Sequence, residues 1–119
     1  MEGSEKAVLN AAEALARAGG SKKLLCRVCQ VFLDNLPAMW AAIQTSVANT
    51  NAVAIQQSAH TLKGSAGVIG AQAAMAAARE LEMMAKSGKW DEVGIASDHL
   101  DRELKRLTPA VADLRDQSA

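Results

Sequence analysis

Apolar side chains recur every three or four positions along most of this chain, which is the spacing of amphipathic α-helices. The pattern predicts a short helix over 5–18, a long helix over 22–48, a third that ends near position 69, and two more over 71–87 and 91–115. Four substantial amphipathic helices joined by short loops indicate an all-α fold. We therefore expect an antiparallel four-helix bundle with a short additional N-terminal helix.

Several residues set the expected boundaries and irregularities of these helices. Ser21 is placed to cap the N-terminus of the second helix. Pro37 should kink that helix without ending it, because the apolar periodicity continues beyond it, and Pro109 should kink or split the last helix. The inward side of the first helix is predicted to carry Val8, Ala11, Ala12 and Leu15.

The composition agrees with packed helices and excludes some function classes. With 119 residues, the chain is expected to form one domain over 1–119. Half of the residues are hydrophobic but only 3% are aromatic, and Lys plus Arg number 13, as do Asp plus Glu. No charge excess therefore favours a nucleic acid or a membrane surface. Because no apolar run reaches the roughly 18 residues of a membrane span and no leader is evident, we expect a cytoplasmic protein.

The third helix carries the most unusual stretch of the chain. Its buried stripe is predicted to consist of Ile55, Ala59, Leu62, Ala66 and Ile69. A second set projects away from that stripe: Gln56, His60, Lys63, Gly64 and Gly67. A glycine inside a helix costs about 1 kcal/mol relative to alanine, so two of them need a reason. They either give another protein access to the imidazole or allow close helix packing, and the spacing alone leaves both interpretations open.

The segment Ala59-His-Thr-Leu-Lys-Gly-Ser-Ala66, with Ile69-Gly-Ala71 and Glu80-Leu-Glu82 behind it, resembles the signature of histidine-containing phosphotransfer (HPt) domains. The upstream segment Phe32-Leu-x-x-Leu-Pro37 is also typical of that family, so the resemblance covers most of the chain. It implies a four-helix bundle that carries a phosphoryl group on an exposed histidine between aspartates of receiver domains in a multistep two-component phosphorelay.

The resemblance also implies roles for single residues. His60 would be phosphorylated, Lys63 would stabilise the phosphoryl group, and Gly64 would give the partner access. An imidazole is largely neutral, and so nucleophilic, near neutral pH, and a nearby ammonium can neutralise phosphoryl oxygens. Gln56, Gly67 and Lys86 are expected to contact the partner.

The expected partners are receiver domains of response regulators and of a hybrid sensor histidine kinase, which would also supply Mg²⁺. The chain itself is expected to be a monomer without metal, cofactor or ATP site, since no Gly-rich nucleotide loop is evident. It would then be a phosphoryl carrier and not an enzyme. Two alternatives stay open: a module excised from a hybrid sensor or chemotaxis-type kinase, and a non-catalytic helical interaction module.

Other polar residues receive less specific interpretations. Cys26 and Cys29 have C-x-x-C spacing but lie inside an apolar helical stripe, so we interpret them as core fillers in a reducing compartment. His99 lacks a comparable glycine and lysine neighbourhood and is interpreted as a surface residue. Glu82 falls where certain relatives have a glutamine that contacts the imidazole. We expect this acid to pair with Arg79 or Lys86 and assign it no catalytic role.

Overall fold

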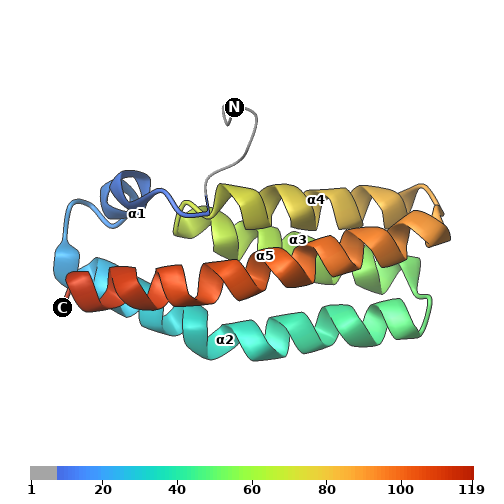
Figure 1. Ribbon diagram of the computed structural model, residues 1–119, viewed down its shortest axis with the longest axis horizontal. Coiled ribbons are helices and arrows are strands. Elements are labelled where there is room, and N and C mark those ends of the chain that lie inside the picture. The colour runs from blue at the N-terminus through green and yellow to red at the C-terminus, as the bar shows by residue number, and fades with distance from the viewer. Residues whose placement is uncertain (1–7) are drawn as a thin grey trace.

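The computed structural model describes residues 8–119, and this part of the chain forms five helices. They are α1 (Ala11–Arg17), α2 (Lys22–Ala48), α3 (Ala52–Val68), α4 (Gln72–Lys86) and α5 (Trp90–Gln117). The four long helices run alternately in opposite directions, as Figure 1 shows, and α1 lies across one end. The predicted fold, an antiparallel four-helix bundle with a short additional N-terminal helix, is confirmed.

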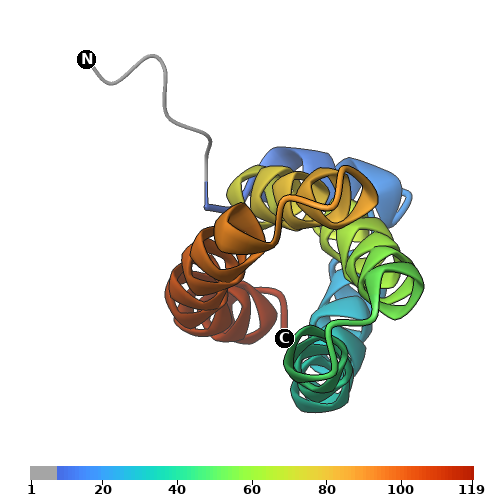
Figure 2. The same ribbon diagram turned by 90° about the vertical axis from the view of Figure 1, so that its right-hand side faces the viewer.

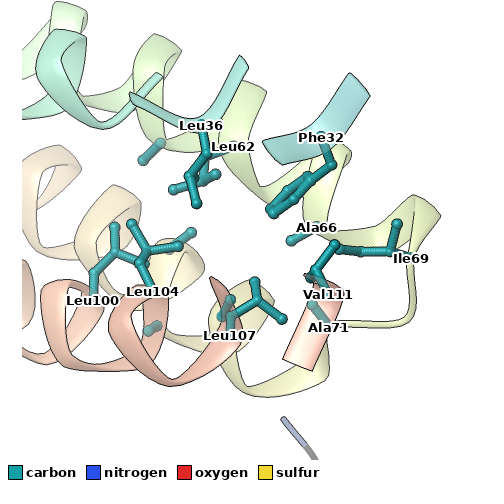
Figure 3. Packing of buried hydrophobic residues seen from close by; sticks show 14 of the residues in the cluster. Phe32, Leu36, Leu62, Ala66, Ile69, Ala71, Leu100, Leu104, Leu107 and Val111 are labelled. Carbon is teal, nitrogen blue, oxygen red and sulfur yellow. The ribbon is translucent and has the colours of Figure 1, made fainter. Parts of the chain in front are cut away.

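The long helices close into a ring around one core, which Figure 2 shows end-on. Each helix packs on the next along the chain, and α5 closes the ring by packing on α2. Figure 3 shows Phe32 of α2 and Leu62 of α3 facing the leucines of α5 across the bundle axis. The contribution of α4 to this core consists mostly of small side chains: Ala73, Ala74, Ala77, Ala78, Leu81 and Ala85. Small side chains let neighbouring helices approach closely.

Side-chain caps fix where α2 and α3 begin. The Ser21 hydroxyl accepts a hydrogen bond from the Leu24 amide at 3.1 Å, as the sequence predicts. Asn51 caps α3 in the same way. Such caps satisfy amide groups that have no partner within the helix.

Neither proline ends its helix. Pro37 lies inside α2 and Pro109 inside α5, and both helices continue past them. Figure 1 shows α2 changing direction along its length, in agreement with the predicted kink. The split considered for the last helix at Pro109 does not occur.

The prediction for the first helix is wrong in its start and in part of its buried side. Residues 5–7 lie outside the described residues, and residues 8–10 are not helical. Asn10 caps α1 instead, because its side chain accepts a hydrogen bond from the Glu13 amide at 2.9 Å. Val8 and Leu15 pack partly buried against the core, as predicted. The helix also buries Ala14, whereas Ala11 and Ala12 are exposed.

The turn between α3 and α4 holds this N-terminal segment in place. The Asn10 amide donates a hydrogen bond to the Gly70 carbonyl at 2.9 Å. Gly70 adopts the left-handed conformation, with a φ of +68°. A Cβ atom at this position would lie 2.8 Å from the Asn10 carbonyl oxygen. Only glycine fits this position without strain or displacement.

We predict that Gly70→Ala destabilises the fold more than Gly88→Ala does. Gly88 has a similar φ of +70° but open space around it, so its replacement costs only the left-handed conformation, about 1–2 kcal/mol. The Gly70 variant adds a backbone clash. Urea unfolding of both variants measures the difference, and equal losses would contradict the close approach of Asn10.

Candidate functional site

His60 lies on the outer surface of α3, with 68% of its side chain exposed. Its Nδ1 atom is 3.4 Å from Oε2 of Glu82 on α4. The structure gives Nε2 no hydrogen bond or ion pair within residues 8–119. One nitrogen of the ring is thus held near a carboxylate while the other is open to solvent.

Lys63 lies one turn after His60 on α3 and also contacts Glu82. Its Nζ donates a hydrogen bond to Oε1 of Glu82 at 2.9 Å, and both side chains are about a quarter exposed. This hydrogen bond is the main reason why the pKa of Glu82 lies below its usual value; the charges of Lys63 and His60 add to the effect, and burial opposes it. Glu82 is therefore ionised near neutral pH, and it can only accept hydrogen bonds there.

The prediction of the ion-pair partner of Glu82 is wrong. The sequence suggested Arg79 or Lys86, which are its neighbours on α4, but the carboxylate turns to Lys63 on α3. The tertiary contact prevails because α3 and α4 pack closely and the carboxylate lies between them. The structure thus brings His60, Lys63 and Glu82 into one three-residue cluster. The sequence interpretation noted the position of Glu82 but assigned the residue no catalytic role and the wrong partners.

The two glycines of α3 lie in different surroundings. A Cβ on Gly64 would meet nothing within 4 Å, so this position is open surface next to His60. A Cβ on Gly67 would lie 3.4 Å from the methyl group of Met75 on α4. The access interpretation thus fits Gly64, and the packing interpretation fits Gly67.

Two other residues that the sequence singled out flank the cluster without joining it. Gln56 is half-buried one turn before His60, and its amide group donates to the Ala52 carbonyl of its own helix at 3.2 Å. Lys86 is exposed at the end of α4, and the structure gives it no hydrogen bond or ion pair within the described range. The structure therefore does not test whether either side chain contacts a partner protein.

The structure also has an apolar groove between α2 and α3, which the sequence interpretation did not predict. It has a volume of about 370 Å³, and its lining includes Leu24 and Val31 of α2 and Val68 of α3, each about half exposed. Val68 lies one turn beyond Gly64, so the groove adjoins the surface that carries His60. The sequence did contain a signal for this groove, namely apolar residues at helix positions outside the predicted core stripes.

The remaining candidates have structural roles or ordinary surface positions. Cys29 is fully buried and Cys26 partly buried, and burial raises the pKa of the Cys29 thiol. The side chain of His99 is 38% exposed and lies 3.5 Å from Glu103 and 3.9 Å from Glu80.

Within residues 8–119, no group of three or more His, Cys, Asp or Glu side chains could hold a metal ion. None of the helices described is long and apolar enough to cross a membrane.

An exposed histidine on a four-helix bundle, with a lysine one turn away, is the arrangement expected of a phosphotransfer domain. The family model described as "Hpt domain" matches residues 27–112, which is most of the chain. The chain therefore belongs to the Hpt domain family of histidine phosphotransfer domains, which interact with receiver domains in general.

Two solved structures share the fold. Histidine-containing phosphotransfer protein B (HptB) from Pseudomonas aeruginosa PAO1 superimposes with a TM-score of 0.85 at 16% sequence identity, covering 95% of this chain and 98% of that one. The HPT domain of an Hpt sensor hybrid histidine kinase from Shewanella gives 0.80 at 22% identity, covering 92% and 95%. A search of curated proteins found no significant match.

The lowered pKa of Glu82 predicts a pH-dependent contribution to stability. A carboxyl group with a depressed folded-state pKa stabilises the fold above its usual pKa of 4.5, and this stabilisation is lost as the pH falls through the folded value. Glu82→Gln should therefore lower the free energy of unfolding at pH 7, and the difference from the native protein should vanish in acid. Urea unfolding from pH 7 to pH 3 measures it. A constant difference across that range would contradict the Lys63–Glu82 bond.

Proposed function

We propose that this protein is a phosphoryl carrier of a multistep phosphorelay. His60 accepts a phosphoryl group from the aspartate of one receiver domain and passes it to the aspartate of another. The observation that best supports the proposal is the orientation of His60, whose Nδ1 faces a carboxylate while its Nε2 has no partner in the described structure. The donor would belong to a hybrid sensor histidine kinase and the acceptor to a response regulator.

The transfer needs no proton acceptor in this orientation. Because ionised Glu82 can only accept a hydrogen bond, Nδ1 carries the ring proton and the Nε2 lone pair points outward. That lone pair forms the new P–N bond. The P–O bond of the aspartyl phosphate breaks, and its electron pair leaves on the aspartate carboxylate. The proton stays on Nδ1 throughout, so charge and protons balance without a base.

Lys63 supplies positive charge for the phosphoryl oxygens. Its ammonium is held by Glu82 at 2.9 Å, and 27% of its side chain stays exposed. Phosphoryl transfer depends mainly on positioning and on neutralising the charge of the transferred group. A lysine on a flexible stem can keep one hydrogen bond to Glu82 and turn another of its three donors to a phosphoryl oxygen.

The receiver would dock over α3 and the apolar groove beside it. Gly64 leaves open surface next to His60, and Val68 continues this surface to the groove between α2 and α3. Exposed apolar patches of this kind mark interaction sites in soluble proteins. Gln56 and Lys86 would lie at the rim, and the Mg²⁺ ion that accompanies the reacting aspartate would belong to the receiver. The carrier would act as a monomer in the cytoplasm.

We predict that His60→Gln folds normally and accepts no phosphoryl group. The side chain is mostly exposed, so its replacement leaves no cavity in the core. Incubation with a phosphorylated receiver, followed by a test for acid-labile phosphate, measures the loss. The control is His99→Gln, which should be phosphorylated like the native protein. Label that remains on the His60 variant, or that disappears from the His99 variant, would overturn the assignment.

We predict that Gly64→Gln slows transfer from a receiver much more than it slows phosphorylation by phosphoramidate. The small donor needs only the imidazole, whereas a receiver must bring its surface against α3. Gly94→Gln on α5 is the matched control, because Gly94 is also a helical glycine with nothing within 4 Å of its Cβ position. Equal slowing with both donors would mean that Gly64 tunes the histidine or the fold instead of giving access.

A further inference from the structure

We propose that Glu82 is a positioning residue that sets how readily phospho-His60 gives up its phosphoryl group. This inference rests on the proposed function and goes beyond it, because it concerns the phosphorylated state. The carboxylate would keep the proton on Nδ1 after phosphorylation, so that the ring leaves as a neutral imidazole when the phosphoryl group moves on.

The argument starts from the charge of Glu82. Its carboxylate receives a hydrogen bond from Lys63 at 2.9 Å and lies 3.4 Å from Nδ1 of His60. Lys63 keeps Glu82 ionised, and an ionised carboxylate favours the protonated form of any group that donates to it. At 3.4 Å the contact with Nδ1 is longer than a well-formed N–H···O bond. It should shorten when the ring gains positive charge.

Phosphorylation supplies that positive charge. A ring that carries the phosphoryl group on Nε2 and a proton on Nδ1 is a cation, and the proton is lost more easily than from a neutral imidazole. A neutral side chain at position 82 would do little to retain it. Glu82 pairs with the cation directly, in the manner of a charge-assisted hydrogen bond.

The proton on Nδ1 determines how good a leaving group the imidazole of His60 is. When phospho-His60 reacts, an oxygen of the acceptor aspartate, or of water, forms a P–O bond while the P–N bond breaks and its electron pair returns to Nε2. With Nδ1 protonated, the departing group is a neutral imidazole. Without that proton it would be an imidazolate anion, which is a far poorer leaving group. Retention of the proton therefore raises the rate at which phospho-His60 gives up its phosphoryl group.

Other charged groups near His60 do not replace Glu82 in this role. Lys63 on α3 is a cation and disfavours a proton on the ring, although its pairing with Glu82 offsets this effect. On α4, Arg79 and Lys86 flank Glu82 in the sequence and are also cations. In the described structure, Glu82 is the one acidic group in contact with the imidazole of His60.

The test is the pH profile for loss of the phosphoryl group. Native protein, Glu82→Gln and the matched control Glu80→Gln are phosphorylated with phosphoramidate, and the decay of phospho-His60 is followed by ³¹P NMR from pH 5 to pH 9. Glu80 is on the same helix but lies 3.9 Å from His99 and makes no contact with His60. The decay rate of Glu82→Gln should fall with rising pH at a pH lower by about one unit, as expected from the loss of the negative charge 3.4 Å from Nδ1. On that falling limb the variant should decay about tenfold more slowly.

The control should follow the native profile. Coincident profiles for the native protein and Glu82→Gln, or an equal shift in Glu80→Gln, would overturn the role of Glu82. A native protein that takes up no phosphoryl group on His60, from phosphoramidate or from a receiver, would overturn the proposed function as well. The two failures are thus distinguishable.

A second measurement applies even if Glu82→Gln does not fold. ¹⁵N NMR of the phosphorylated native protein reports directly whether Nδ1 is protonated, and a phosphorylated peptide of residues 54–70 serves as the reference without Glu82. The protein should retain the Nδ1 proton to a higher pH than the peptide. Loss of the proton at the same pH in both would refute the inference.

Discussion

The close packing of α3 against α4 is the constraint on which the site depends. Ala59 and Ala66 on α3 and Ala74 and Ala78 on α4 are all buried, and Gly67 lets Met75 pack against the surface of α3. Larger side chains at these positions would separate the helix axes. Because the axes are close, a carboxylate on α4 reaches both the lysine and the histidine of α3. The alanine-rich composition of the chain thus has a direct chemical consequence.

One carboxylate consequently serves two partners. Glu82 orders the Lys63 ammonium by a direct hydrogen bond and orients the His60 ring by a longer contact. All three side chains are at least partly exposed, so the cluster is held together by geometry and charge and not by enclosure. This arrangement leaves the His60 ring mostly exposed and the Lys63 side chain partly exposed.

The sequence predicts the long helices well because each is governed by one strong apolar periodicity. The helix over 22–48 coincides with α2, and the others agree with the structure within a few residues. The prediction fails where a cap or a distant contact decides. The start of α1 is set by its cap, in which the Asn10 side chain accepts a hydrogen bond from the Glu13 amide, and apolar periodicity does not report such a cap. The partner of Glu82 lies 19 positions away on another helix. Helical spacing describes neighbours three or four positions apart, and it carries no information on such pairs.

The exposure of His60 has a consequence for the order of events in the proposed relay. A single imidazole on an open helix face would offer one docking surface, and the proposed donor and acceptor would both have to use it. They would occupy it only in turn, so their binding would be mutually exclusive. An unphosphorylated acceptor present in excess would therefore act as a competitor of the donor. The flux through such a carrier depends on how quickly each partner leaves, as well as on the chemistry of transfer.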